Sequence, residues 1–549
     1  MMLSDNFIKS TVVVLALLIN QVCWASESPL TRAESSDYSA TSRYADVMAF
    51  IHALQRQSDL LRVETLGISP EGNKIPLLVI GSPVPSSPTD LNHDDRVVVY
   101  FQANIHAGEV EGKEAALMLA RSLALDQSPD ILDRLVVLIA PIFNVDGNDK
   151  ISPDNRPRQN GPAEGVGIRL NGRNQDLNRD GIKLESPEVR GLVQNVLNRW
   201  DPVFFLDAHT HNGSYHEEPV TWVWGLNPLG DLALFDFMEN VAWPEIEKRM
   251  RKDFNTLTIP HGDFLDPREP GKGWIPLGPE PRYLSNYVGM RNRLAVLDEQ
   301  YPYADFRVRV QGSYHLMISF LDLLHDQRDR IVMLITAADR QTIERGLNPS
   351  TEDVFIVKYG REALEHPVTI HGYELEVKGE GRYASVRPTE TRRTYPNVPY
   401  LAKYTPKQTV RFPRGYLISV SDAEIIDKLL QHGIVIERLV EPVRLPVEIF
   451  TVDKLTGSGR STQGHYTSTV EGRTTLEERD FPAGTYLVRT AQPLANVAAY
   501  LLEPQSDDGL VFWNYFDRYL GFQRWPEPKE YPVYKLYDAP RLVTETIAP

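Results

Sequence analysis

Short apolar runs alternate with helical patterns along the first part of the chain. Four short apolar runs predict buried strands at residues 96–101, 135–140, 203–206 and 294–297. Segments between them, such as residues 112–124, carry apolar residues at helical spacing. A strand that is apolar on both sides needs cover on both faces of its sheet. The sequence therefore predicts an α/β fold with a mixed, mostly parallel sheet and helices on both faces.

The pattern changes after a helical stretch at residues 326–345. Beyond it, short alternating strands are broken by Pro and Gly, and one further helix is predicted at residues 423–431. We therefore expect an α/β domain at residues 42–348 and a mostly β C-terminal region of one or two small modules at residues 349–549.

Composition restricts the partners and the location of this 549-residue chain. A formal net charge of −16 argues against nucleic acid or an anionic membrane, because either would favour a basic face. Residues 1–25 are typical of a signal peptide: Lys9 precedes an apolar core too short to span a bilayer, and a cleavage site precedes Ser26. Lipidation of Cys23, the single cysteine, is the alternative. We expect an exported protein, periplasmic or extracellular, with a flexible N-terminal arm at residues 26–41.

Candidate ligands and catalytic groups follow the predicted strands. His106 and Glu109 lie in the turn after the first of them, and a histidine with a carboxylate three residues on can close on one metal ion. Such pairs are common by chance. The interpretation of this pair as a metal site therefore depends on further groups along the chain. Those groups, most of them just past a predicted strand, are Asn144, Asp146, Gly147, Asp176, Asn178, Arg179, Asp207, His209, His211, Asp298 and Glu299.

In this order the motifs resemble those of zinc carboxypeptidases of the carboxypeptidase A type. The resemblance covers residues 44–324, and amidohydrolases like aspartoacylase and succinylglutamate desuccinylase share the same core. It implies one zinc ion per chain, held by His106, Glu109 and His209, with one position left for water. His211, on the same side of an extended chain as His209, is the alternative third ligand.

The resemblance also implies roles around the metal. Asp176 would accept a hydrogen bond from the first zinc histidine and fix the orientation of its ring. Asn178 and Arg179 would hold the free carboxylate of the substrate, for which the planar fork of arginine is suited. Glu299 would be the general base that takes a proton from water and passes it to the leaving amine, with Asp298 as the alternative.

Departures from the family pattern leave some positions open. An Ala-Gly pair follows His106 where carboxypeptidases of this type carry Ser-Arg, so one substrate-guiding arginine is missing. For the arginine that stabilises the oxyanion we choose Arg158, with Arg156 as the alternative. For the tyrosine that caps the substrate we choose Tyr287 over Tyr283, although core packing would also explain either residue.

The sequence thus predicts an exported zinc metallocarboxypeptidase that hydrolyses the C-terminal peptide bond of peptides, with cell-wall peptides among the candidates. Its chemistry would be zinc-activated water with a glutamate general base. An aspartoacylase-like amidohydrolase acting on small N-acyl amino acids is the first alternative, kept open by the missing arginine. An inactive binding or scaffold protein is the second, and the completeness of the motif set argues against it. No histidine of residues 349–549 has a recognisable ligand spacing, so we expect that region to be structural or to orient substrate.

Overall fold

The computed structural model describes residues 28–125, 129–211, 213–379, 385–521, 529–538 and 540–547. The predicted signal peptide at residues 1–25, including Cys23, lies outside the described residues. Within the described ranges, no helix combines the length and the apolar character needed to cross a membrane.

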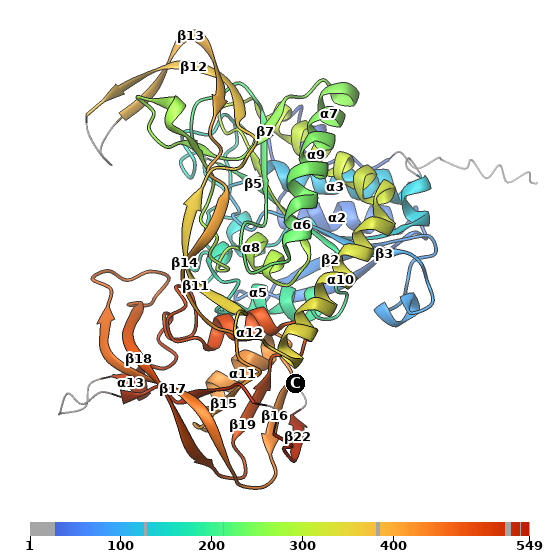
Figure 1. The fold of residues 1–549 in the computed structure, drawn as a ribbon. Helices are drawn as coiled ribbons and strands as arrows, with labels where there is room; N and C mark the ends of the chain where they lie inside the picture. The colour runs from blue at the N-terminus through green and yellow to red at the C-terminus, as the bar shows by residue number, and fades with distance from the viewer. Residues whose placement is uncertain are drawn as a thin grey trace, which may run out of the picture.

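A mixed sheet of eight strands forms the centre of the first part of the chain (Figure 1). The strands are β1 Leu61–Ile68, β2 Lys74–Ile80, β3 Val97–Ala103, β4 Leu135–Ala140, β5 Phe204–Thr210, β6 Val220–Trp224, β7 Thr258–Pro260 and β10 Leu294–Gln300. Their order in the sheet is β1-β2-β4-β3-β5-β10-β6-β7. The central run from β4 to β10 is parallel, as is the pair of β6 with β7, while β1 with β2, β2 with β4, and β10 with β6 are antiparallel. A short ribbon pairs β8 Asp263–Phe264 with β9 Trp274–Ile275.

Helices lie on both faces of this sheet, so the predicted fold class is confirmed. On one face, α3 Glu111–Ala124 packs against α9 Phe306–Asp326. Asp298 of β10 accepts a hydrogen bond from Ser313 of α9, which places Asp298 on that face. Neighbouring residues of a strand point to opposite sides, so Glu299 faces the other way, where α8 Leu284–Met290 contacts β5 and β10. Further helices of this part are α1 Arg32–Ser35, α2 Tyr44–Gln55, α4 Val145–Asn148, α5 Pro187–Leu192, α6 Leu232–Phe237, α7 Trp243–Phe254 and α10 Arg328–Leu347.

Two strands run further than their apolar cores predict. β5 includes Asp207 and His209, and β10 includes Asp298 and Glu299. The parallel pairing of these strands matches Glu299 with His209, so the polar ends are hydrogen-bonded in the sheet like the apolar residues before them. These four candidate residues, Asp207, His209, Asp298 and Glu299, therefore lie on the ends of strands and not in the loops that follow.

The flexible arm predicted at residues 26–41 is wrong for the part that the structure describes. Thr31 caps α1 by accepting a hydrogen bond from the backbone of Glu34. The hydroxyl of Thr41 donates to the buried carboxylate of Glu114 on α3 at 2.8 Å, and Ala33 is fully buried. The polar composition suggested exposure, but its hydroxyl groups pair with a charge inside the fold.

The C-terminal region is mostly β, as predicted, and contains several antiparallel sheets (Figure 1). Its strands are β11 Val354–Glu362, β12 Val368–Lys378, β13 Ser385–Val398, β14 Lys403–Arg411, β15 Gly415–Ile418, β16 Ile436–Leu439, β17 Val443–Gly457, β18 Ser468–Phe481, β19 Tyr486–Arg489, β20 Lys529–Glu530, β21 Val533–Leu536 and β22 Thr544–Ile547. Its helices are α11 Ala423–Gln431, α12 Ala495–Leu502 and α13 Asp517–Leu520. β11 pairs with β14 and β12 with β13, while a larger sheet runs β18-β17-β21-β15-β19-β16-β22, with β20 beside β17. In Figure 1 the β12–β13 hairpin projects at one end of the molecule and the larger sheet lies at the other.

The two parts of the chain share one hydrophobic core. A single cluster of buried apolar side chains includes Phe205 and Trp274 from the first part and Tyr400 and Tyr500 from the second. The hydroxyl of Tyr400 also donates to the backbone carbonyl of His261 at 3.0 Å. The C-terminal region is thus packed as a continuation of the first part, and a domain boundary near residue 348 stays a prediction.

Candidate active site

His106, Glu109 and His209 meet at the carboxyl ends of two neighbouring strands. His106 and Glu109 lie in the loop from β3 to α3, and His209 lies on β5, which pairs with β3. The Nδ1 atoms of His106 and His209 lie 3.1 and 3.0 Å from Oε2 of Glu109, and 3.1 Å from each other. Within the described residues, this is the one group of three or more histidine, cysteine or acidic side chains whose ligand atoms converge.

Each histidine of this cluster is held through its other ring nitrogen. Nε2 of His106 lies 3.0 Å from Oδ1 of Asp176, and Nε2 of His209 lies 2.9 Å from Oδ2 of Asp207. An ionised carboxylate favours a proton on the Nε2 that faces it, which leaves the Nδ1 of a neutral ring with an unshared electron pair. Although burial would raise the pKa of Asp176, His106 and Arg169 outweigh it and hold that pKa well below its usual range.

The donor set of this cluster fits a zinc ion. Two imidazole nitrogens and one carboxylate oxygen are a ligand set of catalytic zinc sites, which keep a further position open. In this structure, two ring nitrogens that face each other at 3.1 Å lie against a carboxylate oxygen, so the centre is rich in electron pairs. A divalent cation between these atoms would stabilise the arrangement.

Two arginines lie against the carboxylates of the cluster. Arg156 donates to Oε1 of Glu109 at 2.8 Å and to the carbonyl of Thr210 at 3.0 Å. Arg169 donates through Nε to Asp176 at 2.9 Å and approaches Oε1 of Glu109 at 3.6 Å. Burial would raise the pKa of Glu109, but its interactions with His106 and Arg156 outweigh burial and hold that pKa well below its usual range.

Glu299 lies beside the cluster on the same face of the sheet. It is the register partner of His209 in the pairing of β10 with β5, and paired side chains point to the same side. Its Oε2 is buried and has no hydrogen-bond partner among the described residues. Burial raises the pKa of Glu299 to about 8. An unpaired buried carboxylate with a shifted pKa, next to a candidate metal site, is typical of a catalytic acid or base.

Asp298 belongs to the opposite face of the sheet. Its Oδ1 accepts from Nε2 of Gln300 at 2.6 Å and its Oδ2 from the hydroxyl of Ser313 at 2.7 Å. The side chain is fully buried, and burial raises its pKa to about 7. These partners belong to the interface of the sheet with α9, so the geometry favours Glu299 over Asp298 as the general base.

Asn178 and Arg179 lie on a short helical turn, Leu177–Arg179, next to the cluster. Nδ2 of Asn178 is 3.4 Å from Nε2 of His209. The half-buried guanidinium of Arg179 lies over the ring of Tyr283, 4.5 Å from its centre, and donates to the carbonyl of Asn178 at 2.7 Å. A guanidinium stacked on an aromatic ring presents its edge for bidentate binding of a carboxylate.

Comparisons with known proteins agree with this geometry. Residues 47–214 match the family model for zinc carboxypeptidases, and this range includes all three candidate ligands.

The similarity to relatives extends beyond the matched domain. The chain is 24% identical to "Carboxypeptidase 2" of Trichophyton equinum and 22% identical to that of Trichophyton rubrum, and each alignment covers 93% of this chain and 90% of the relative. A solved metallo-carboxypeptidase from Burkholderia cenocepacia superposes with a TM-score of 0.38 at 18% identity, over 52% of this chain and 69% of that one. The curated relatives therefore span both the carboxypeptidase domain and the C-terminal region.

The tyrosine chosen to cap the substrate, Tyr287, lies away from the candidate site. Tyr287 is fully buried, and its hydroxyl lies 2.7 Å from Nδ1 of His432 and accepts from Arg291 at 3.2 Å. These contacts hold Tyr287 in the core between the two parts of the chain. The alternative, Tyr283, lies against Arg179 and is the tyrosine of the two that borders the candidate site.

Arg158, chosen as the oxyanion arginine, and His211, the alternative third ligand, also lie away from the cluster. Arg158 is exposed and hydrogen-bonds with Tyr303, whereas the alternative Arg156 contacts Glu109. His211 accepts from the backbone of Gly213 through Nδ1, and its Nε2 lies 3.3 Å from Nε2 of His216. The structure thus brings Arg156 and His209 to the site in preference to Arg158 and His211.

Sequence reasoning assigned no role to Asp207 and did not name Arg169, although both hold the cluster. Asp207 is the partner of His209, and the alternation of a strand, which puts residues two apart on one face, could have indicated this. Arg169 is the partner of Asp176, but it lies in an irregular segment whose sequence carries no such signal.

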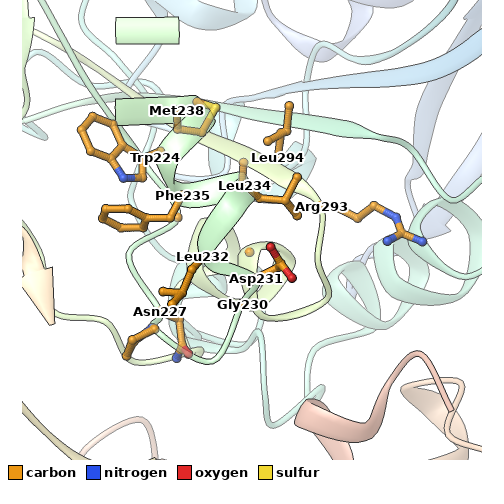
Figure 2. Close-up of a pocket in the computed structure, with 14 residues that line it drawn as sticks. Trp224, Asn227, Gly230, Asp231, Leu232, Leu234, Phe235, Met238, Arg293 and Leu294 are labelled. Carbon is orange, nitrogen blue, oxygen red and sulfur yellow. The ribbon is translucent and has the colours of Figure 1, made fainter. Parts of the chain in front are cut away.

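The pocket drawn in Figure 2 is separate from this site. It lies against Trp224, Asp231, Leu232 and Arg293, and none of the candidate site residues lines it. Its volume of about 30 Å³ leaves room for about one water molecule. We therefore assign it no ligand.

Proposed function

We propose that this protein is an exported zinc metallocarboxypeptidase that removes the C-terminal residue from peptides. The family supports the zinc carboxypeptidase activity. The observation that carries the proposal is that the Nδ1 atoms of His106 and His209 converge on Glu109, with Glu299 beside them on the same face of the sheet.

One zinc ion per chain is proposed, bound by His106, Glu109 and His209. At this site zinc would supply a Lewis acid that polarises the scissile carbonyl and lowers the pKa of water. Asp176 and Asp207 would keep the two rings oriented, because each carboxylate holds the ring nitrogen that faces away from the centre.

Arg179 and Asn178 would bind the free carboxylate at the end of the peptide. The guanidinium is fixed against Tyr283, so little ordering is needed before it pairs with a carboxylate. A substrate with an amidated C-terminus would leave this half-buried guanidinium without its anion. The proposal therefore predicts strong discrimination against capped peptides.

Glu299 would move the proton. Its Oε2 would accept a proton from the attacking water and deliver it to the nitrogen of the leaving amino acid. Arg156, the arginine that contacts Glu109, would donate hydrogen bonds to the carbonyl oxygen as negative charge develops on it. Both groups lie beside the proposed ligands.

The absence of the guiding arginine favours one other function. An amidohydrolase of the aspartoacylase type would act on small N-acyl amino acids, and the Ala-Gly pair after His106 leaves that possibility to be tested. A panel of free-C-terminus peptides, their amidated forms, cell-wall peptides and N-acyl amino acids separates the two. We expect release of single C-terminal residues from free peptides, loss of activity with a chelator and its return with zinc. Equal rates on free and amidated peptides would contradict the exopeptidase proposal.

Export rests on the sequence of residues 1–25. In cells that make the full chain, the mature protein should be found outside the cytoplasm, and its N-terminal sequence should begin at Ser26. A full-length chain retained in the cytoplasm would overturn this part of the proposal.

A further inference from the structure

Side chains of the C-terminal region contact the segment that carries Asp176, Asn178 and Arg179. This segment, residues 176–185, begins at the carboxylate that holds His106. It is contacted by side chains from distant parts of the C-terminal region: Lys428, His432, Gln463, His465 and Tyr515.

Gln463 makes the contact nearest the metal cluster. It lies at the tip of the β17–β18 hairpin in a left-handed conformation, φ 52°, followed by Gly464 at φ 85°. The backbones of Thr462 and His465 exchange hydrogen bonds of 2.8 and 2.9 Å, so these four residues form a two-residue hairpin turn. Such turns favour Asn, Asp or Gly at the first central position, so glutamine there costs conformational energy. Its side-chain oxygen accepts a hydrogen bond from the backbone N–H of Asp176 at 3.4 Å.

His465 ties the same turn to the other end of the segment. Its Nε2 lies 2.8 Å from Oε1 of Glu185, and its Nδ1 lies 3.2 Å from Oδ1 of Asn514. The hydroxyl of Tyr515 donates to the same oxygen of Glu185 at 3.0 Å. The hydrogen bond to Glu185 raises the pKa of His465, which favours a charged pair. The hairpin tip is therefore anchored at both ends of residues 176–185.

Two more contacts satisfy carbonyl groups within the segment. Nε2 of the fully buried His432 lies 3.1 Å from the carbonyl of Ile182, and Nζ of Lys428 donates to the carbonyl of Leu184 at 3.1 Å. Neither carbonyl belongs to a helix or strand, and a buried carbonyl needs a partner. The path of this irregular segment thus depends on the C-terminal region.

We propose that Gln463 and His465 are positioning residues of the active site, and that the C-terminal region serves to hold residues 176–185 in their binding geometry. By fixing the backbone of Asp176, Gln463 would keep His106 oriented and Arg179 in place for the substrate carboxylate. A strained residue whose side chain reaches an active-site segment is typical of a functional position. The inference rests on the proposed carboxypeptidase function for its effect on turnover.

The test uses full-length Gln463→Ala and Gln463→Gly, with Ser461→Ala on the exposed part of the same loop as the control. Hydrogen exchange of residues 176–185 should be faster in both Gln463 variants and unchanged in the control. At matched zinc content, kcat/KM for a free-C-terminus peptide should fall about 5-fold in both, mainly through KM, as expected for one hydrogen bond. Glycine relieves the left-handed strain, so Gln463→Gly should match the wild type in Tm while it shares the loss of kcat/KM.

A second pair of variants tests the anchor at Glu185. His465→Gln keeps a hydrogen-bond donor and should retain more activity than His465→Ala. Unchanged exchange of residues 176–185 and kcat/KM within 2-fold of wild type in both Gln463 variants would overturn the inference. Restoration of full activity by Gln463→Gly would also overturn it, because activity would then follow fold stability alone. Hydrogen exchange needs no substrate, so it decides the positioning role even if the wild type cleaves no peptide and the proposed function fails.

Discussion

Glu299→Gln is the change that tests the proposed mechanism most directly. Glutamine keeps the size of the side chain but cannot take a proton from water. Because Oε2 of Glu299 has no hydrogen-bond partner among the described residues, the substitution removes no internal hydrogen bond from that oxygen. Replacing a buried carboxylate by a neutral amide should leave Tm unchanged or raise it slightly. Loss of general base catalysis should lower kcat by roughly 10²–10⁴-fold.

Asp298→Asn is the matched control. It should lower the folding stability and leave turnover nearly unchanged, which is the reverse of the effect expected for Glu299→Gln. The two carboxylate oxygens of Asp298 accept from Gln300 and from Ser313. Asparagine keeps one acceptor, and the hydroxyl of Ser313 can turn to accept from the new amide. The cost should be about 1 kcal/mol of folding free energy, a fall in Tm of a few degrees, with kcat within about 3-fold of wild type.

The assay compares the two variants at matched zinc content. It measures kcat and KM on a free-C-terminus peptide, and thermal unfolding is measured separately. Metal analysis is essential because lost zinc would look like lost catalysis. Near wild-type turnover in Glu299→Gln together with inactive Asp298→Asn would show that the base was assigned to the wrong carboxylate. If both variants turned over normally, the base would lie elsewhere in the site.

The remaining predictions concern the metal, the substrate and stability. His106→Ala should lose most of its zinc by metal analysis, and near-full occupancy would contradict the ligand assignment. Arg179→Lys keeps the charge but loses the bidentate fork, so KM for free-C-terminus peptides should rise about 10-fold while amidated peptides stay poor substrates; equal KM in both proteins would refute this. Burial raises the pKa of Glu188 from 4.5 to about 7. Since the folded pKa lies above the unfolded one, the wild type should lose stability as the pH rises from 4.5 through 7. Glu188→Gln should not, so in urea denaturation the variant should be more stable at pH 8 by up to about 3 kcal/mol and equal near pH 4.5, and a gap independent of pH would count against the reasoning.

The sequence predicts the fold well where apolar patterns are complete. β4 and α11 have the bounds that the pattern predicts, because each is delimited by a clear change from apolar to polar or turn residues. At β5 and β10 the pattern stops early, since the last residues of these strands are polar and are used by the site. Where a strand ends in polar residues of the site, the apolar pattern therefore underestimates the length of the strand.

The candidate site is predictable as far as local motifs reach. His106 and Glu109 are three residues apart, and their convergence follows from one turn. The choice between Arg156 and Arg158 is different, because it depends on the irregular path of a loop, and two residues of sequence separation decide which side chain faces Glu109. Local spacing therefore indicates His106 and Glu109 as candidate ligands, but not every group that contacts them.

The contacts of the C-terminal region could not be predicted from spacing at all. Gln463 and Asp176 are 287 residues apart, and nothing in the sequence around Gln463 indicates the partner of its side chain. The Gln-Gly pair predicts a turn, and a turn alone predicts an exposed tip. Only the fold shows that this tip rests on the segment of Asp176 and Arg179, and that His465 secures it at Glu185. A region with no ligand motif of its own can therefore still shape the active site, because the hydrogen bonds that an irregular catalytic segment needs come from wherever the fold supplies them.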